Sequence, residues 1–316
     1  MDEVAMTIVA LHHADGRVFV IADGLISRGA NRVIEQDQKI IVFEPRYRIP
    51  RAGLGHFSHF DDFTGGQFGL AYAGNFTLIS TIVKKFLRVV EHLMYLDRSS
   101  VGGKPEIYSR ENYADYFRGL SYDDSYNSSS DELIPITVNL LSNVLHRVAK
   151  SACLDFAKNA MSHPDASFFV FGLDEPTRSQ TSRAQVLKYL TVANGEVGYQ
   201  RYSVLPWSLS CIGDATVIPG LIAAVEADNK YSSRPPTLPA PQLADPFDGW
   251  LGQTASDSAF RKNREHTIQR YVLAIIEQDV GTIGGQCTIA ESAVAGRFNV
   301  STIRKENISA TLQSMQ

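Results

Sequence analysis

Three residues with complementary chemistry are evenly spaced near the start of this 316-residue sequence: Thr7, Asp23 and Lys39. A threonine hydroxyl becomes a nucleophile when a base removes its proton, and a free N-terminal amine on the same residue can be that base. A neighbouring lysine ammonium lowers the proton affinity of both groups, and a carboxylate holds the lysine in place. If the three side chains converge, these residue types predict nucleophilic attack on an amide bond.

The local sequence indicates how they could converge. Residues 7–12 and 17–22 are β-branched runs separated by HADG, which is a hairpin signal, and residues 38–43 predict a third strand. Thr7 begins the first strand, Asp23 ends the second and Lys39 lies near the start of the third. In a hairpin the start of one strand and the end of the next are neighbours, so we expect the three side chains at one rim of a sheet. Strand capping and a surface ion pair are the simpler alternative.

The order of the remaining elements predicts the fold. Further strands are expected at 67–73, SFFVFGLDE, QVLKYLTV, SLSCIG and about 286–293, and helices at about 75–95, 136–161, 215–227 and 260–278. Strands and paired helices thus follow one another in groups, whereas a doubly wound sheet would alternate them singly. The prediction is an α+β fold, a four-layer αββα sandwich in one domain over residues 1–316. The polar stretch 98–133 and the Pro-rich stretch 229–258 are expected to be surface insertions.

Composition excludes several function classes. A formal net charge of −4 and a pI near 6.1 give no electrostatic case for a nucleic-acid or anionic-membrane partner. The three widely spaced cysteines argue against a disulfide scaffold and fit a reducing compartment. The acidic start is not a signal peptide, and no window is apolar enough to span a bilayer, so a cytoplasmic location is expected.

One segment has residues with the spacing of metal ligands. HFSHFDDF contains His56, His59, Asp61 and Asp62. Aromatic-rich segments often hold such residues for packing, and this is the favoured interpretation. Neither a metal nor another cofactor is predicted.

Residues 7–43 resemble the start of proteasome-type β subunits, in the N-terminal nucleophile (Ntn) hydrolase superfamily, and especially the HslV-type bacterial ATP-dependent peptidases. The matching positions are Thr7, Gly16, Asp23, Ser27-Arg28-Gly29 and Lys39-Ile40. The resemblance implies that Thr7 is the nucleophile with its own amine as the base, and that Asp23 and Lys39 form the supporting pair. It also implies that Ser27 and Gly29 offer backbone groups to an extended peptide substrate.

Three later segments extend the resemblance. LAYAGNFT is similar to the turn that opens the family's first helix, which implies that the N–H of Gly74 stabilises the oxyanion; relief of crowding between strand and helix is the other interpretation. In CIGDAT, Gly213 precedes Asp214 where the family has a serine, and a carboxylate there is expected to favour the protonated amine. EQDVGTIGGQCTIAE is similar to an element before a late strand of the family. Its nearest matches are Asp279, Thr282, Gly284 and Gly285.

The resemblance implies a proteasome-like threonine peptidase that self-associates into stacked rings. Its substrates would be unfolded or short peptides, and an ATP-dependent unfoldase is a candidate partner. Thr7 can act only without residues 1–6, after self-cleavage or after translation from Met6 and removal of that methionine. Two alternatives stay open: a catalytically silent ring or scaffold subunit, and an Ntn amidohydrolase that acts on small amides.

Overall fold

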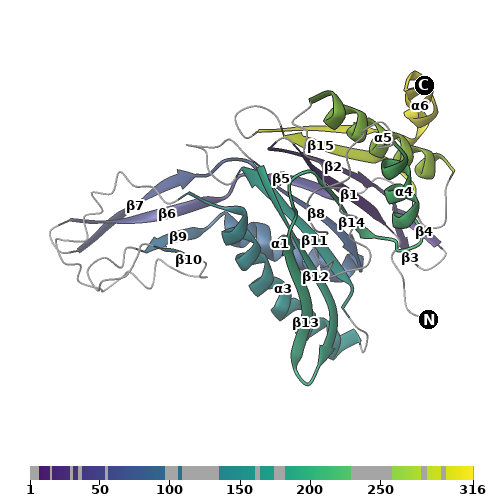
Figure 1. Ribbon diagram of the computed structural model, residues 1–316. Coiled ribbons are helices and arrows are strands. Elements are labelled where there is room, and N and C mark those ends of the chain that lie inside the picture. The colour runs from purple at the N-terminus through teal and green to yellow at the C-terminus, as the bar shows by residue number, and fades with distance from the viewer. Residues whose placement is uncertain are drawn as a thin grey trace.

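The structure is a computed structural model, and it describes residues 7–14, 16–28, 31–34, 38–53, 56–96, 106–108, 135–160, 164–173, 182–228, 258–278, 283–292 and 297–315. Two five-stranded antiparallel sheets lie face to face (Figure 1). The first sheet has the order β14-β1-β2-β15-β16 and contains β1 (Ile8–Ala14), β2 (Arg17–Asp23), β14 (Ser208–Gly213), β15 (Cys287–Ser292) and β16 (Phe298–Ile303). The second sheet has the order β13-β12-β11-β8-β5 and contains β5 (Ile40–Phe43), β8 (Phe68–Gly74), β11 (Ala166–Leu173), β12 (Ser182–Ala193) and β13 (Glu196–Ser203).

Alternation along the strands decides which side chains enter which core. In β1, Val9 and Leu11 belong to the apolar cluster between the two sheets. Their neighbours Ile8 and Ala10 belong to the cluster under the helices that cover the first sheet. Because successive side chains of a strand point to opposite faces, both faces of β1 are buried.

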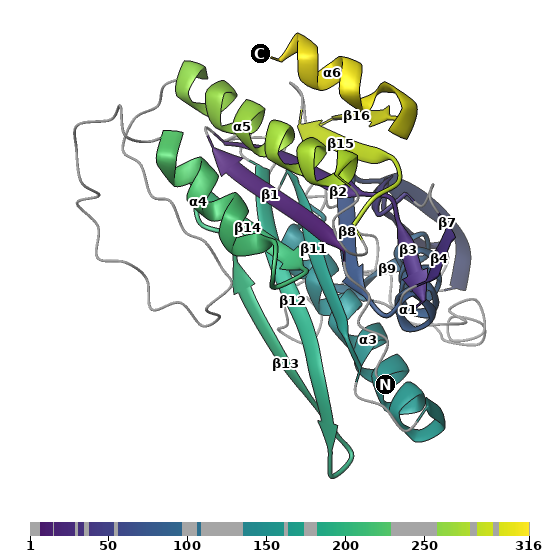
Figure 2. The same ribbon diagram turned by 90° about the vertical axis from the view of Figure 1, so that its right-hand side faces the viewer.

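Helices cover the outer face of each sheet. The second sheet packs against α1 (Phe76–Val90) and α3 (Val138–Ala160). The first sheet lies under α4 (Ile218–Asp228) and α5 (Ser258–Glu277), and the short η5 (Lys305–Asn307) leads into α6 (Ile308–Ser314) beside α5 (Figure 2). The start of α1 is fixed by Asn75, whose side chain accepts a hydrogen bond from the N–H of Leu78 at 3.1 Å.

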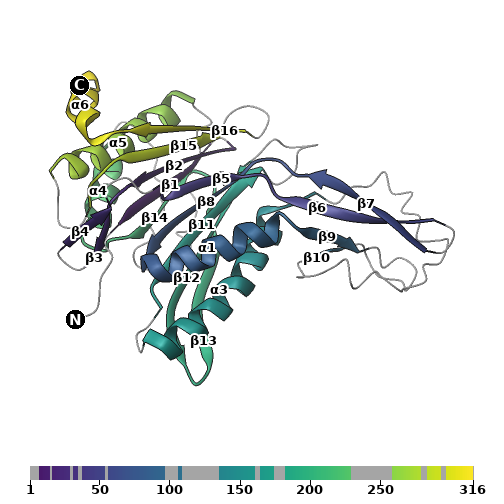
Figure 3. The same cartoon turned by 180° about the vertical axis from the view of Figure 1, so that it is seen from behind.

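A third sheet points away from the other two (Figure 3). It contains β6 (Arg46–Gly53), β7 (His56–Thr64), β9 (Leu93–Leu96) and β10 (Glu106–Tyr108), in the order β10-β9-β6-β7. A further pair, β3 (Ile26–Arg28) with β4 (Asn31–Ile34), forms a two-stranded sheet. Tyr47 and Ile49 join the core cluster of α1 and α3, and so fix the base of the third sheet.

The four-layer αββα sandwich expected as the fold class is wrong. The described chain is mostly antiparallel β-sheet with few helices, and the sheet of β6, β7, β9 and β10 belongs to no layer of that scheme. Sequence analysis assigned no strand to residues 44–66, although Arg46 and Arg48 are exposed while Tyr47 and Ile49 are buried. This alternation is typical of a half-buried strand. The expected insertions, 98–133 and 229–258, lie outside the described residues except for β10 and the first residue of α5.

Candidate functional site

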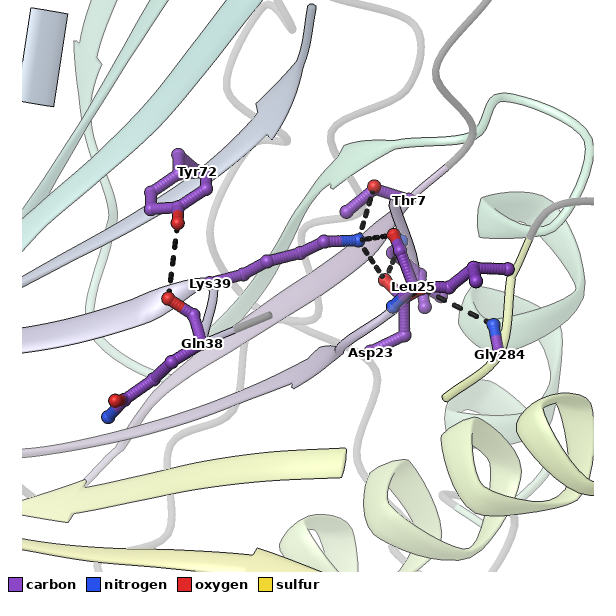
Figure 4. Close-up of polar contacts among 8 residues, drawn as sticks. Thr7, Asp23, Leu25, Gln38, Lys39, Tyr72 and Gly284 are labelled. Atoms are coloured by element: carbon purple, nitrogen blue, oxygen red, sulfur yellow. Dashed lines mark hydrogen bonds and ion pairs between the residues drawn. The ribbon is translucent and has the colours of Figure 1, made fainter. Parts of the chain in front are cut away.

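Thr7, Asp23 and Lys39 meet at one end of the first sheet (Figure 4). Thr7 directly precedes β1, and the antiparallel pairing of Val9 with Ala22 places Asp23 beside the start of β1. Lys39 directly precedes β5 and extends its side chain from the second sheet to the first. All three side chains are almost completely buried, with exposed fractions of 4%, 1% and 3% for Thr7, Asp23 and Lys39. The geometry therefore differs from a surface ion pair.

The Lys39 ammonium uses each of its three N–H groups. Nζ donates to Thr7 Oγ1 at 2.7 Å, to Asp23 Oδ1 at 3.1 Å and to the carbonyl oxygen of Leu25 at 2.5 Å. An ammonium has three donors and no acceptor, so these bonds satisfy it completely. A lysine held in this way presents a fixed positive charge to the threonine oxygen. It is not free to serve as the base.

The Asp23 carboxylate is held by a ring of donors. Oδ1 accepts from the backbone N–H of Ile8 at 3.0 Å and from Lys39, while Oδ2 accepts from the N–H of Leu25 at 3.3 Å and of Gly284 at 3.4 Å. Complete burial raises the pKa of the Asp23 carboxyl, and the Lys39 charge and the N–H groups of Ile8 and Gly284 act against this rise. These donors fix the carboxylate in the position that orients Lys39.

The backbone of Thr7 is fixed by Gly213 and Asp214. The N–H of Asp214 donates to the carbonyl oxygen of Thr7 at 2.7 Å. A Cβ at Gly213 would lie 1.7 Å from that same oxygen, and Gly213 has a φ of +117°, so glycine is needed there. The Asp214 carboxylate accepts from the N–H and the hydroxyl of Thr216, each at 2.7 Å. Its expected effect on the threonine amine stays a prediction.

Tyr72 on β8 holds the segment that carries the lysine, and sequence analysis missed it. Its N–H donates to the carbonyl oxygen of Lys39 at 3.2 Å, and its hydroxyl donates to that of Gln38 at 3.1 Å (Figure 4). One residue thus binds two consecutive carbonyl groups just before β5 begins. The sequence signal was the pairing of the strands at 38–43 and 67–73, which could have placed Tyr72 beside Lys39.

The other expected site residues have different outcomes. Gly74 ends β8 with a φ of +121°, and a Cβ there would lie 2.4 Å from the carbonyl oxygen of Asp165. Glycine is therefore needed for close packing, and the oxyanion role stays a prediction. Ser27 lies in β3 and pairs with Arg32. Gly29, Asp279 and Thr282 lie outside the described residues.

The segment with metal-like spacing forms ion pairs. His59 Nε2 lies 3.4 Å from Asp61, which also accepts from Arg51 Nε at 2.5 Å, and Arg48 Nε lies 3.3 Å from Asp62. Within the described ranges no group of three His, Cys, Asp or Glu side chains is arranged to hold a metal ion. None of the helices in the described part is both long and apolar enough to cross a membrane.

Comparisons with known proteins show a distant likeness at the level of the fold. No protein-family model and no curated protein matches the sequence. Among 320 matching chains of solved structures is a (Gly-1) mutant of Anbu from Hyphomicrobium sp. strain MC1, with a TM-score of 0.50 and 9% identity over 98% of this chain and 92% of that one. The chain is thus distantly similar in structure to Anbu, a proteasome-like protein. The expected identification as a proteasome-type β subunit of the HslV type is wrong: the structural likeness found is to Anbu, and at 9% identity it concerns the fold alone.

Proposed function

We propose that this chain is a threonine-type peptidase with Thr7 as its nucleophile. The observation that carries the proposal is the 2.7 Å hydrogen bond from Lys39 Nζ to Thr7 Oγ1, made by an ammonium whose other two N–H groups are bound to Asp23 and Leu25. A positive charge fixed beside a hydroxyl favours its alkoxide form. The site also contains Asp23, a buried carboxyl whose pKa is raised by burial beside the Lys39 charge, and ionisable groups perturbed in this way cluster at functional sites.

The reaction has two steps. Thr7 Oγ attacks the carbonyl carbon of the scissile amide while the α-amine of Thr7 takes the hydroxyl proton and passes it to the leaving amine. Lys39 stabilises the threonine oxygen, Asp23 orients Lys39, and the N–H of Gly74 is proposed as the oxyanion donor. The resulting ester is then hydrolysed by water, which the same amine activates. The amine can act only when Thr7 is the first residue of the chain.

The deciding experiment combines the state of the N-terminus with labelling. We expect intact mass and N-terminal sequencing to find chains that begin at Thr7, and a peptide epoxyketone to add to them and stop hydrolysis of a peptide-fluorophore. Thr7→Ala should abolish turnover and labelling, whereas Thr7→Ser should retain some of both. The control Thr81→Ala removes a hydroxyl from the exposed side of α1 and should change neither.

Other outcomes lead to the two alternatives. If every chain keeps residues 1–6 and none is labelled, catalysis by Thr7 is excluded. The remaining hypothesis is then a catalytically silent scaffold subunit. If small amides are cleaved and peptides are not, the protein is an Ntn amidohydrolase for small amides. We also propose self-association into stacked rings, with an ATP-dependent unfoldase as a candidate partner. A stable monomer in sedimentation at micromolar concentration would contradict the rings.

A further inference from the structure

β5 is the end strand of the second sheet, and a groove runs along it. Within the described residues β5 pairs with β8 alone. The groove has a volume of about 680 Å³ and is bounded by residues 41–44, by the C-terminal end of α1 and by the base of the β6–β7 hairpin. Figure 3 shows how β5 leads into that outward-pointing hairpin. An end strand beside a groove can accept a further strand.

The register shows which backbone groups face away from β8. The N–H of Tyr72 donates to the carbonyl oxygen of Lys39, and the pairing continues from Ile40 opposite Ala71. Because bonded and non-bonded pairs alternate along an antiparallel ladder, Lys39 and Ile41 direct their N–H and C=O groups to β8. Val42, which lines the groove, therefore directs its backbone N–H and C=O groups to the side of β5 that faces away from β8. These groups are placed to bind an extended backbone.

The side chains of the groove suit a polypeptide of mixed sequence. Apolar side chains line part of it: Ile41, Phe43, Leu87 and Val90. Charges of both signs lie around them: Glu44, Arg46, Arg48, Asp62 and Glu91. A ligand rich in phosphate needs an excess of positive charge, which is not present here. Opposite charges beside apolar surface, together with backbone groups that face away from β8, fit an extended segment with apolar and charged side chains.

We propose that this groove binds an extended segment of an unfolded polypeptide as an added strand on β5. The inference rests on the proposed function in one respect, namely that the bound segment belongs to a substrate of Thr7. Lys39 directly precedes β5 and its Nζ lies 2.7 Å from Thr7 Oγ1, so the Lys39 end of the strand is the end nearest to the candidate nucleophile. At about 3.3 Å per residue, the strand from Lys39 to Glu44 covers roughly 17 Å. The groove would hold substrate residues several positions away from the cleaved bond.

Peptide binding to the full-length Thr7→Ala protein tests the groove without hydrolysis. The probe is a fluorescein-labelled ten-residue peptide in which valine alternates with lysine and glutamate, and its binding is followed by fluorescence anisotropy. Val42→Pro removes the N–H that an added strand needs and keeps the bonds to β8. We expect it to weaken binding roughly tenfold or more, as for the loss of one or two hydrogen bonds. The matched variant Val42→Ala keeps the N–H and should weaken binding about threefold at most.

A change in the peptide tests the same contact without altering the protein. The same peptide with an N-methyl group on every residue has no backbone N–H to donate from either edge, and we expect it to lose binding even if Val42→Pro folds poorly. Equal binding of the methylated and unmethylated peptides would overturn the proposal, as would equal binding by the Val42→Pro and Val42→Ala proteins.

Failure of the groove and failure of the peptidase are distinguishable. If the peptide binds through Val42 but the epoxyketone does not label the natural protein, the proposed catalysis is refuted and the proposed groove is supported. If hydrolysis occurs and Val42→Pro lowers kcat/KM equally for four-residue and ten-residue substrates, the catalysis stands and the groove fails. The proposal expects a loss for the longer substrate alone.

Discussion

The first sheet has a cluster of buried polar side chains at each end, and the two clusters differ in how their hydrogen-bonding groups are satisfied. At the Thr7 end, each N–H of the Lys39 ammonium has an acceptor. At the other end, the His12 side chain is completely buried, and among the described residues neither ring nitrogen has a hydrogen-bond partner. Both Lys39 and His12 are buried, but of the two only the Lys39 side chain is held in one position by hydrogen bonds.

The amino-acid sequence of α5 accounts for part of the difference. Ile268, Val272 and Ile276 pack in the apolar cluster that contains Ile8 of β1. The first turns of α5 instead bury three charged side chains: Arg261, Arg264 and Glu265. Arg261 lies 3.3 Å from Glu265, and Arg264 Nη1 donates to the carbonyl oxygen of Trp207 at 3.4 Å. One helix thus covers the sheet with apolar residues in one part and with charges in another.

Burial affects the titration of this second cluster. It lowers the pKa of His12 to about 3, with further contributions from the charges of Arg264, His13 and Arg261. It raises the pKa of Glu265 to about 7, against the attraction of Arg261. In the Thr7 cluster, hydrogen bonds hold the Lys39 ammonium in one position. In the His12 cluster, burial disfavours the charged forms of His12 and Glu265. Four substitutions test this difference.

The largest effect is expected for Lys39→Met. The change leaves Asp23 buried without its counter-ion, which costs about 3–5 kcal/mol of unfolding free energy. Turnover should fall about a hundredfold to a thousandfold, as when one charge-stabilising donor is removed from an active site. Urea unfolding and peptide hydrolysis measure the two effects. Lys84→Met, on the exposed side of α1, is the control, and an equal loss in both variants would refute the role of Lys39.

The next effect concerns pH and Glu265→Gln. The pKa of Glu265 is raised in the folded state, so the native protein holds more protons than the unfolded chain between about pH 4.5 and 7. Its contribution to stability is therefore present at low pH and is lost as pH rises through 7, by up to about 1.4 kcal/mol per pH unit. Urea unfolding should show that the natural protein gains more stability over Glu265→Gln at pH 5 than at pH 7.5; the difference between the two proteins is compared because His12 titrates in both. The exposed Glu277→Gln serves as control.

A smaller effect of opposite sign is expected for His12→Leu. Replacing a buried group without hydrogen-bond partners by an apolar one of similar size should stabilise the protein by about 1 kcal/mol or more at pH 7.5. The lowered pKa of His12 also means that its contribution to stability is lost as pH falls from 6.5 towards 3, and the variant should lack this loss. Chemical unfolding at several pH values measures both.

His146→Leu is the matched control for that substitution. His146 Nδ1 lies 3.3 Å from the hydroxyl of Tyr189, so its replacement removes a hydrogen bond and should destabilise the protein. If both histidine variants change the unfolding free energy in the same direction, satisfaction of hydrogen bonds does not explain the contrast between the two ends of the sheet.

The smallest effect is expected for Tyr72→Phe. The change removes the hydrogen bond to Gln38 and leaves the ring in its core cluster and the Tyr72 N–H on Lys39. The lost hydrogen bond contributes about 1 kcal/mol to holding Lys39 beside Thr7. We therefore expect the epoxyketone to label Thr7 roughly fivefold more slowly. The unfolding midpoint should change little, which separates positioning from stability. Tyr199→Phe, on an exposed ring, should alter neither labelling nor unfolding.

The sequence was most informative where spacing and strand pairing agree. The hairpin of β1 and β2 predicted that Thr7 and Asp23 would be neighbours, and Lys39 was expected beside them; the structure confirms that these three side chains meet. The helical spacing at 75–95 predicted α1, which the structure shows over Phe76–Val90. In both cases the controlling interactions are local, or join strands that follow one another closely in the chain.

Contacts between distant segments could not be predicted in the same way. The N–H of Gly284 reaches Asp23 from 261 residues away, and no spacing rule encodes that approach. β13 and β16 were missed because their exposed positions weaken the alternation of polar and apolar residues. The fold class failed for a similar reason, since β9 pairs in parallel with β6 although two strands and a helix lie between them in the chain. The burial of His12 was not predicted either, because it depends on packing against α5.

The saturated ammonium of Lys39 has a consequence for chemical modification. Acylating reagents need the free lone pair of a deprotonated amine and a path to it. Lys39 offers no such path, because its three N–H groups are bound and only 3% of the residue is exposed. Lys84 and Lys85 on the exposed side of α1 should be acylated first, and a fluorescent tag attached through surface lysines would leave Lys39 unmodified.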